Sequence, residues 1–236
     1  MRGFFVTATD TGVGKTVVTG ALVRALSGRG YAVGVAKPVQ SGNLADDPAG
    51  DAMLLRGWAG VDDDPAEICP YAFAAPLAPL VAARLEGRAV EPARILDAIQ
   101  RLAGRYDVLL VEGAGGLLVP VGEDWTIADL AGWIGLPLVV VARAGLGTVN
   151  HTLLTLAAAR QGGLEPAAVV LNGLRGDTDP SWRTNPELIA GFGGVPLLGT
   201  IPWLDADAPS LPDRAAEHLV LDALLATLER EEAPRA

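Results

Sequence analysis

The sequence is poor in the residues on which disulfide frameworks, zinc clusters and basic surfaces depend. Its 236 residues include one cysteine, Cys69, which excludes an intrachain disulfide and a zinc site built from several cysteines. Lysine and arginine together number 18, against 28 aspartate and glutamate residues, so the formal net charge is −10 at pH 7. Because nucleic acids and anionic membranes are bound by basic surfaces, this charge argues against both as partners.

Long hydrophobic runs and aromatic side chains are scarce as well. No apolar run reaches the length of a membrane span before a glycine or a charged residue interrupts it. The N-terminus enters a predicted strand at once, and so we expect a cytoplasmic protein without a signal peptide. Hydrophobic residues make up 50% of the chain but aromatic residues only 5%. We therefore expect a core of alanine, valine and leucine, in one domain that spans residues 1–236.

Short, continuous apolar runs alternate along the chain with segments of helical spacing. Because continuous runs suit strands that are buried on both faces, the alternation predicts an α/β fold with a mostly parallel central sheet between helices. We expect surface loops at Asp62–Pro65 and Asp177–Pro186, and a frayed end at Glu229–Ala236. The predicted strands are Gly3–Ala8, Ala32–Ala36, Val108–Val111, Leu138–Ala142, Ala168–Leu171 and Leu197–Ile201. The predicted helices are Lys15–Arg29, Asp51–Ala59, Pro79–Glu86, Pro92–Ala103, Ile127–Ile134, Thr148–Gln161 and Asp213–Arg230.

The first predicted strand runs into a segment with the features of a phosphate-binding loop. Thr9–Thr16 reads Thr-Asp-Thr-Gly-Val-Gly-Lys-Thr and leads directly into a predicted helix. Backbone N–H groups of such a loop converge on an anion, Lys15 adds a positive charge, and Thr16 can offer its hydroxyl to Mg²⁺. The pattern GxxxxGK[ST] has glycine where this chain has Thr9, and the alternative is a plain strand–turn–helix corner with a surface lysine. The loop favours a P-loop NTPase-like, three-layer fold.

Polar or glycine-rich segments follow every predicted strand. In an open parallel sheet, the carboxyl ends of the strands form the edge at which ligands bind. Because all of these segments fall at that edge, the sequence predicts one large active site there. Besides the phosphate loop, the segments are Lys37–Gly42, Glu112–Gly116, Gly145–His151, Asn172-Gly173 and Pro202–Leu204.

Some residues at this edge have both a chemical and a structural interpretation. Lys37 can neutralise charge on a transferring phosphoryl group or an anionic substrate, or else it faces solvent. Ser41 can hydrogen-bond a substrate oxygen, or it serves as a turn residue or helix cap. The N–H groups of Gly145–Asn150 precede a helix and can bind a carboxylate, or Thr148 simply caps that helix.

The candidate metal ligands are carboxylates. Glu112 ends an apolar strand, where a carboxylate is costly to bury unless it meets a cation. That cation can be Mg²⁺, held between nucleotide phosphates and one or two carboxylates, or a lysine of the same edge. Asp51 is a second candidate ligand, or the N-cap of the helix that it opens. Asp46 and Asp47 compete with it for the metal, and spacing alone does not separate the three.

Taken together, these segments resemble the dethiobiotin synthetases, a family of ATP-dependent carboxylases that close a ureido ring. The matching segments stand in the family's order and cover the chain from residue 6 to about residue 204. The phosphate loop alone is less specific than the loop combined with the segments around Lys37 and Glu112. The matching segments are Val6–Thr16, Lys37–Gly42, Asp51-Ala52, Glu112–Gly116, Leu146–His151 and Gly199–Leu204.

The resemblance implies a reaction and its partners. The substrates are 7,8-diaminopelargonate, CO₂ or bicarbonate, and ATP or another nucleoside triphosphate, with Mg²⁺ as cofactor. A carbamate forms on one amine and takes the γ-phosphoryl group to give a carbamic-phosphoric anhydride, and the second amine then closes the ring. The resemblance also implies a homodimer in which Leu146–Asn150 of one subunit meets the substrate carboxylate in the other subunit's site.

The resemblance further implies a role for each matching residue. The catalytic residues are Lys37, Lys15 and Thr11. The nucleotide-binding residues are Gly12, Val13, Gly14, Lys15, Thr16, Val17, Asp51, Glu112, Gly113, Ala114, Gly115, Asn172, Gly173, Pro202, Trp203 and Leu204. The substrate-binding residues are Thr11, Lys37, Ser41, Gly115, Leu146, Gly147, Thr148, Val149 and Asn150. The metal ligands are Thr16, Asp51 and Glu112.

Two departures and two rival interpretations accompany the resemblance. The chain has Ala8 where the family has glycine at the loop entrance, and residues 205–209 lack the glutamate that often follows in the family. An ATP-driven switch protein of the partition or septum-site type is one rival, but such proteins carry a second lysine where this chain has Asp10. A cobyrinate-type amidase is the other, but it needs a glutaminase domain for which the chain has no room. The sequence does not separate ATP from CTP as the nucleotide.

Overall fold

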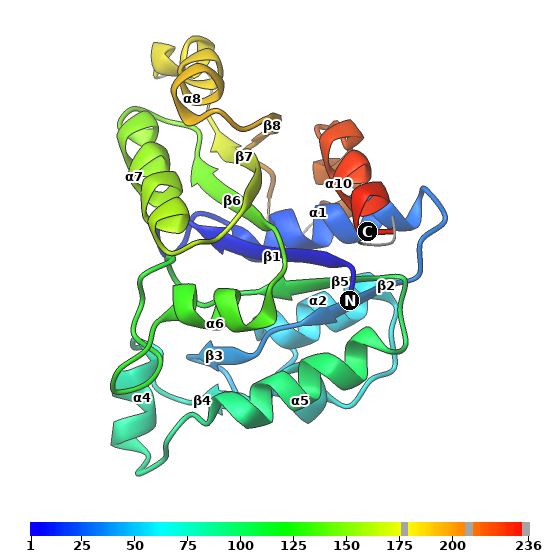
Figure 1. Ribbon diagram of the computed structural model, residues 1–236, viewed down its shortest axis with the longest axis vertical. Helices are drawn as coiled ribbons and strands as arrows, with labels where there is room; N and C mark the ends of the chain where they lie inside the picture. The colour runs from blue at the N-terminus through cyan, green and yellow to red at the C-terminus, as the bar shows by residue number, and fades with distance from the viewer. Residues whose placement is uncertain (176–178, 206–209, 233–236) are drawn as a thin grey trace.

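The protein is built around a parallel sheet with helices packed on both faces (Figure 1). The computed structural model describes residues 1–175, 179–205 and 210–232. The elements are β1 (Gly3–Ala8), α1 (Lys15–Ser27), β2 (Val33–Ala36), β3 (Val39–Ser41), α2 (Asp51–Ala59), α3 (Pro65–Ile68), β4 (Tyr71–Phe73), α4 (Pro79–Leu85), α5 (Pro92–Ala103), β5 (Val108–Glu112), α6 (Ile127–Ile134), β6 (Leu138–Arg143), α7 (Thr148–Gln161), β7 (Pro166–Leu174), the 3₁₀ helix η1 (Pro180–Arg183), α8 (Asn185–Gly193), β8 (Leu197–Pro202), α9 (Leu211–Ala216) and α10 (Asp222–Glu232).

Within the described residues, six strands form the main sheet in the order β2-β5-β1-β6-β7-β8, and β3 pairs with β4 in a small second sheet. Every pairing of neighbouring strands is parallel. The carboxyl ends of the main strands therefore meet at one edge, as the sequence predicts. No helix of the described residues is long and apolar enough to cross a membrane.

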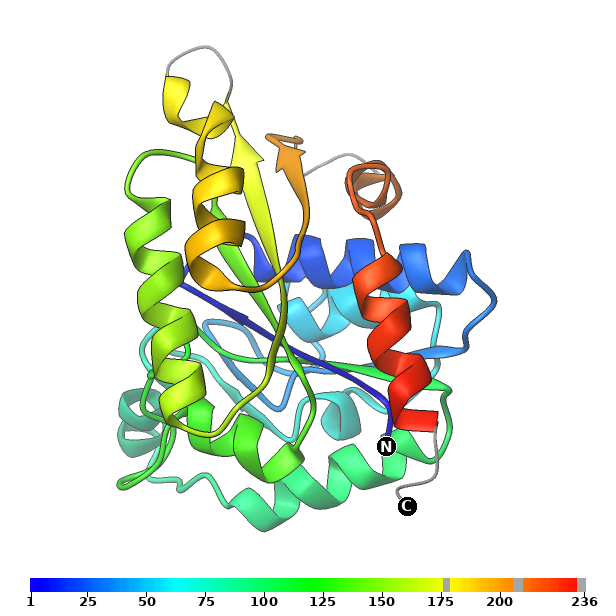
Figure 2. The ribbon, with the colours of Figure 1, turned by 45° about the horizontal axis from the view of Figure 1, so that its top comes forward.

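Successive residues of β1 point to opposite faces of the sheet, and each face is covered by helices. Phe4 and Val6 face a core cluster that includes side chains of α1, α2, α9 and α10. Phe5 faces a second cluster, to which α4, α5, α6 and α7 contribute. A third cluster joins β6 and β7 to α7 and α8. Figure 2 shows α7 and α8 on one side of the sheet and α1 and α10 on the other, which is the predicted three-layer arrangement.

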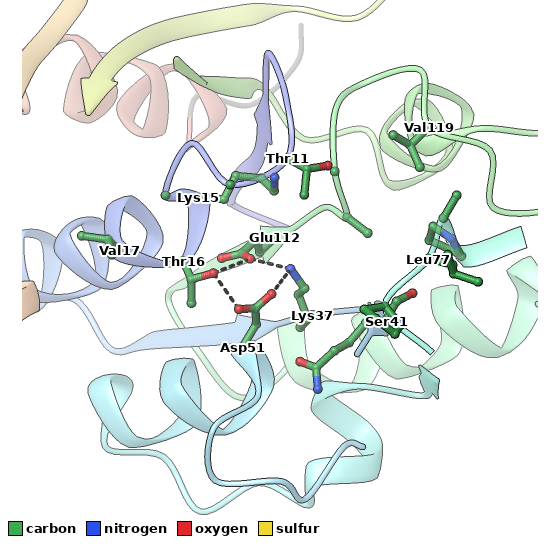
Figure 3. Close-up of a pocket in the computed structure, with 18 residues that line it drawn as sticks. Thr11, Lys15, Thr16, Val17, Lys37, Ser41, Asp51, Leu77, Glu112 and Val119 are labelled. Atoms are coloured by element: carbon green, nitrogen blue, oxygen red, sulfur yellow. Dashed lines mark hydrogen bonds and ion pairs between the residues drawn. The ribbon is translucent and has the colours of Figure 1, made fainter. Parts of the chain in front are cut away.

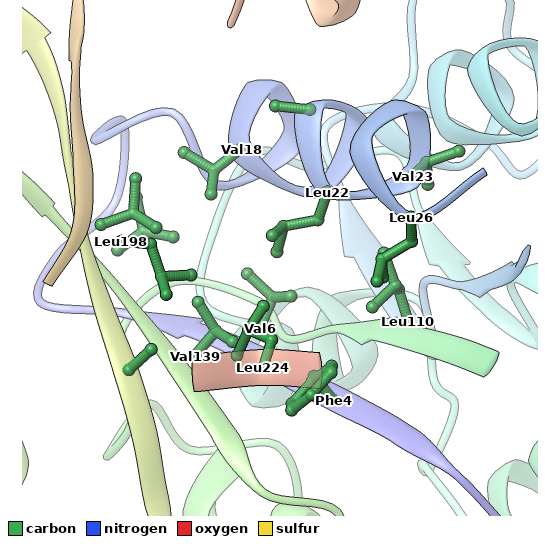
Figure 4. Close-up of a cluster of buried hydrophobic side chains, with 14 of the residues drawn as sticks. Phe4, Val6, Val18, Leu22, Val23, Leu26, Leu110, Val139, Leu198 and Leu224 are labelled. Carbon is green, nitrogen blue, oxygen red and sulfur yellow. The ribbon is translucent and has the colours of Figure 1, made fainter. Parts of the chain in front are cut away.

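The packing of α1 holds the phosphate loop in place. Val18, Leu22 and Leu26 recur every four residues, so they share one face of the helix, and each is fully buried. They lie against Phe4 and Val6 of β1 in the cluster of Figure 4. Because β1 and α1 are both fixed by this contact, the loop that joins them has little freedom at either end.

The ends of the chain depart from the prediction. The predicted helix Asp213–Arg230 is wrong as a single helix, because the chain breaks between α9 and α10. At the break, Val220 N donates a hydrogen bond of 2.8 Å to Leu198 O, so the segment lies along the edge strand β8 instead of coiling. The predicted end Glu229–Ala236 lies partly outside the described residues.

The predicted loop Asp177–Pro186 is also wrong in part. Residues 177–178 lie outside the described residues, but η1 and the start of α8 fall within the segment. Asp179 begins η1 by accepting a hydrogen bond from Ser181 N. The short strands β3 and β4 were not predicted, because each has three residues and no periodicity of its own.

The predicted surface loop Asp62–Pro65 contains a buried ionic contact instead. Asp63 is 8% exposed, and its Oδ1 accepts a hydrogen bond of 2.6 Å from Arg105 Nη1. The hydroxyl of Tyr106 donates to Asp63 Oδ2. Burial, followed by this bond, raises the pKa of Tyr106 to about 12, so the hydroxyl stays protonated as a donor. Asp64 then caps α3, since its Oδ1 accepts from Ala66 N at 2.8 Å.

We expect Asp63→Ala to lower the free energy of unfolding by about 2 kcal/mol, because it removes a buried acceptor of charge-assisted hydrogen bonds. Urea denaturation measures the change. Asp62→Ala is the matched control: Asp62 is the exposed neighbour, it makes one ion pair of 3.8 Å, and its loss should cost less than about 0.5 kcal/mol. Equal effects of the two variants would contradict a structural role for Asp63.

Candidate active site

The register between β2 and β5 brings a lysine beside a glutamate. Ala36 lies opposite Val111, so the next residues, Lys37 and Glu112, are neighbours at the strand ends. Lys37 Nζ lies 2.5 Å from Glu112 Oε1, with Lys37 3% exposed and Glu112 fully buried. The structure thus contains the glutamate–lysine ion pair that the sequence left open as an alternative.

The side chains of Thr16 and Asp51 complete this group. Lys37 Nζ lies 2.8 Å from Asp51 Oδ2, and Thr16 Oγ1 lies 3.0 Å from both Asp51 Oδ1 and Glu112 Oε1. Figure 3 shows the four side chains converging, and we refer to Thr16, Lys37, Asp51 and Glu112 as the Lys37 cluster. Each comes from a different segment: the start of α1, the end of β2, the start of α2 and the end of β5.

Thr19 belongs to the same arrangement and was not predicted. Its Oγ1 lies 2.9 Å from Glu112 Oε2 and is fully buried, so both carboxylate oxygens of Glu112 have partners. Thr19 follows Thr16 by three residues and therefore lies on the same face of α1. This spacing was the signal in the sequence that could have identified it.

The structure separates the three candidate aspartates. Asp51 lies in the Lys37 cluster, whereas Asp46 is exposed. Asp47 is engaged in its own loop, because Asn43 Nδ2 donates to its Oδ2 and Ala49 N donates to its Oδ1, each at 2.9 Å. These two bonds lower the pKa of Asp47. Of the three, Asp51 is therefore placed to meet a cation.

Burial and charge act in opposite directions in the cluster. Burial alone lowers the pKa of Lys37, but the charges of Glu112 and Asp51 outweigh it and raise that pKa above its ordinary value. Burial likewise raises the pKa of Asp51, yet the charge and hydrogen bond of Lys37 lower it overall. Lys15 has no such compensation: burial, and then the charge of Lys37, lower its pKa to about 8. Lys37 is therefore held as a cation between two carboxylates.

The oxygen atoms of the Lys37 cluster fit Mg²⁺. Magnesium takes oxygen ligands, and in nucleotide sites one or two carboxylates suffice, with water and phosphate oxygens in the remaining positions. Thr16, Asp51 and Glu112 provide a hydroxyl and two carboxylates in mutual contact. Among the described residues, no group of three or more His, Cys, Asp or Glu side chains is placed to hold a metal, which agrees with the absence of a predicted zinc site.

A cavity of about 740 Å³ opens beside the cluster. Ser41 Oγ is buried there and has no hydrogen-bond partner among the described residues, so its hydroxyl is available to a ligand. Leu77 and Val119, which were not predicted, lie on the side away from the cluster (Figure 3). The predicted site residues that line the cavity are Thr11, Gly12, Gly14, Lys15, Thr16, Val17, Lys37, Ser41, Asp51, Glu112, Ala114 and Gly115. Gly113 contributes its carbonyl oxygen, 3.2 Å from Lys37 Nζ.

A second pocket of about 260 Å³ lies on the other side of the phosphate loop. Asn172 Nδ2 donates to Val13 O at 2.9 Å and so ties the loop to the end of β7. Gly14 has a φ of 89°, and a Cβ there would lie 2.1 Å from Asn172 Nδ2, so glycine is required for this approach. The predicted residues that line the second pocket are Gly12, Val13, Gly14, Val17, Asn172, Gly173, Pro202, Trp203 and Leu204.

Comparison with known proteins gives the site its context. A family model described as "AAA domain" matches residues 2–209. The ATP-dependent dethiobiotin synthetase BioD of Bacillus cereus (strain B4264) is 44% identical over 233 residues, which cover 98% of this chain and 96% of the relative. The protein of the same name from Anaeromyxobacter dehalogenans (strain 2CP-C) is 51% identical over 227 residues, 96% of this chain and 98% of the relative. The chain belongs to the family of ATP-dependent dethiobiotin synthetases.

The predicted family and fold class are thus confirmed. Among solved structures, the cell division ATPase MinD of Pyrococcus furiosus covers 99% of this chain and 100% of its own, with a TM-score of 0.55 and 21% sequence identity. This likeness shows the fold alone. The septum-site rival therefore shares the architecture with the dethiobiotin synthetase family, whereas the sequence relatives belong to that family.

Arg143 is a residue of the site that sequence reasoning missed. It ends β6 and lines the second pocket, and its Nη2 lies 3.3 Å from Asp10 Oδ2 in the phosphate loop. A charged residue that ends an apolar strand was the signal, as it was for Glu112. The interpretation stopped that strand one residue early, at Ala142.

The predicted segment Leu146–Asn150 is not brought into either of these two cavities. Gly147 is the N-cap of α7, and Thr148 is buried beside Thr152 within the helix. Leu146 is 81% exposed, and Asn150 is exposed as well. Within this chain, the segment is therefore separate from the Lys37 cluster.

Proposed function

We propose that this chain is an ATP-dependent dethiobiotin synthetase, which carboxylates 7,8-diaminopelargonate with CO₂ and closes the ureido ring in biotin biosynthesis. The observation that carries the proposal is the Lys37 cluster, which places a buried cation beside a phosphate loop in a cavity large enough for a second substrate. The curated relatives bear the name of this activity across nearly the full chain.

The two cavities suit the two ends of a nucleoside triphosphate. They share Gly12, Gly14 and Val17, so a chain of phosphates can pass along the loop from the second pocket into the large cavity. The N–H groups from Gly12 onward and the ammonium of Lys15 would hold the phosphates. The base would occupy the second pocket, where Trp203 offers an aromatic face that the Arg175 guanidinium covers at 3.8 Å.

The large cavity suits the carbamate chemistry. One amine of the substrate adds to CO₂ and loses a proton, which gives an anionic carbamate. Lys37 would attract this anion, and the unbonded hydroxyl of Ser41, together with Thr11, would hydrogen-bond its oxygens. A carbamate oxygen then attacks the γ-phosphorus and ADP leaves. The second amine attacks the carbamoyl carbon of the resulting anhydride, loses a proton and expels phosphate, which closes the ring.

Thr16, Asp51 and Glu112 would hold Mg²⁺, which supplies positive charge against the phosphate oxygens when it is bound. We expect Asp51→Asn and Glu112→Gln to raise the Mg²⁺ concentration for half-maximal rate at least about tenfold, because each removes an anionic ligand. The measurement is a Mg²⁺ titration of dethiobiotin formation. Asp47→Asn is the matched control and should change this concentration less than about twofold. If Asp47→Asn shifts the titration and Asp51→Asn does not, Asp47 is the ligand.

We also infer a single domain and a homodimer that works in the cytoplasm. Leu146–Asn150 lines neither cavity of its own chain, and the exposure of Leu146 supports its use by a partner subunit. In the dimer, this segment would meet the substrate carboxylate in the other subunit's site, where the N–H groups at the start of α7 can bind an anion.

Mass spectrometry of the product tests the activity. The purified chain, ATP, Mg²⁺, diaminopelargonate and ¹³C-bicarbonate should give dethiobiotin with one heavy carbon, and ADP in equal amount. Omission of diaminopelargonate should abolish product. Hydrolysis of ATP at the same rate with and without diaminopelargonate, and no labelled product, would instead favour a switch ATPase of the MinD type.

A further inference from the structure

The side chain of Gln40 on β3 makes hydrogen bonds at both ends of the loop that leads to α2. Gln40 is 2% exposed. Its Nε2 donates to Asn43 O and Leu44 O, each at 3.1 Å, and its Oε1 accepts from Ala52 N at 2.9 Å. The amide therefore spans from the beginning of the loop to the first turn of the helix, and its bonds are directed to protein groups.

This contact caps α2 from outside the helix. The first N–H groups of a helix lack intrahelical partners, and a side chain of the N-cap residue usually accepts from one of them. The N-cap of α2 is Gly50, which has no side chain for this purpose. A Cβ at Gly50 would lie 2.6 Å from Gln40 Nε2, so a larger N-cap residue would displace the amide. Gln40 thus takes the role that the N-cap residue has in other helices.

The capped turn carries a member of the Lys37 cluster. Asp51 is the first residue of α2, next to the Ala52 N–H that Gln40 binds. From there its carboxylate reaches Lys37 Nζ at 2.8 Å and Thr16 Oγ1 at 3.0 Å. We propose that Gln40 is a positioning residue, whose amide fixes the start of α2 and thereby aims Asp51 at the metal. The inference rests on the proposed function and extends it to a residue outside the ligand set.

Binding of Mn²⁺ in the presence of ADP, followed by electron paramagnetic resonance, tests the role without turnover. We expect Gln40→Met, which keeps the volume and removes the amide, to weaken Mn²⁺ binding by about 10- to 100-fold, the usual effect of losing a group that orients a metal ligand. Affinity for ADP in EDTA, measured by calorimetry, should change less than about threefold, because the phosphate loop is untouched. Wild-type Mn²⁺ affinity in folded Gln40→Met would overturn the proposal.

Asn43→Ala is the matched control, because it breaks a side-chain bond of the same loop but leaves the cap of α2 intact. It should keep Mn²⁺ affinity within about threefold, and a loss as large as that of Gln40→Met would show that any loosening of the loop suffices, against a specific role. If Gln40→Met does not fold, Gln40→Asn replaces it: one methylene shorter, its amide cannot make all three bonds, and unchanged Mn²⁺ affinity again overturns the proposal.

Two further readings separate this inference from its alternatives. A raised KM for diaminopelargonate in Gln40→Met, with Mn²⁺ affinity unchanged, would make Gln40 a substrate contact and overturn the positioning role. Wild-type protein that binds Mn²⁺ with ADP but makes no dethiobiotin would refute the proposed function, while the effect of Gln40 on metal binding would stand by itself.

Discussion

Replacement of Lys37 by glutamine is expected to lower the rate of dethiobiotin formation by about 100-fold or more, the size of effect seen when one charged group is removed from a developing anion. Affinity for the nucleotide, measured by calorimetry with Mg²⁺ present, should fall less than about tenfold. The reason is the position of Lys37: it comes from β2 on the far side of Glu112 from the loop, whereas Lys15 is part of the loop itself.

The structure shows why this variant needs a control for folding. Lys37 compensates two carboxylates, one of them fully buried, and its loss leaves them facing each other across Thr16. Thermal unfolding with Mg²⁺ and ADP should therefore accompany the kinetics. Lys15→Gln is the matched variant and should lose nucleotide affinity and turnover together. If Lys37→Gln behaves like Lys15→Gln, Lys37 holds phosphates and has no separate role with the carbamate.

The central sheet could be predicted because its strands are buried on both faces. β1 is apolar from Gly3 to Ala8 apart from Thr7, and such continuity has few alternatives. The peripheral elements gave no comparable signal. β3 has three residues, and the break at Val220 depends on a hydrogen bond to Leu198, a residue far away in the sequence. Contacts of that kind leave no periodic pattern in the chain.

The site could be predicted where chemistry follows a strand directly. Lys37 and Glu112 each come immediately after or at the end of an apolar run, and the parallel register then makes them neighbours. Asp51 could not be separated from its two competitors, because the loop between β3 and α2 has no regular geometry from which to infer direction. Gln40 decides the matter in the structure through bonds to three backbone groups, and a glutamine in sequence does not reveal its partners.

A mixture of two inactive variants should recover activity if the site is shared between subunits. We expect Lys37→Ala and Asn150→Ala homodimers each to be nearly inactive, since every site would lack one partner. When subunits exchange, half of the dimers become mixed, and a mixed dimer has one site with both lesions and one with none. Activity should then return to about a quarter of wild type, as a symmetric, isologous pair requires.

The structure makes this outcome a sharp test of the dimer. Asn150 lies on the exposed start of α7 and lines neither cavity of its own chain, so its loss has no route to the Lys37 cluster within one subunit. Native mass spectrometry establishes that exchange has occurred, and the rate of each homodimer alone sets the baseline. Asn150→Ala with near-normal activity would remove Asn150 from the substrate site. With both variants impaired and exchange complete, a mixture no more active than its components would mean that each subunit builds its whole site from its own residues.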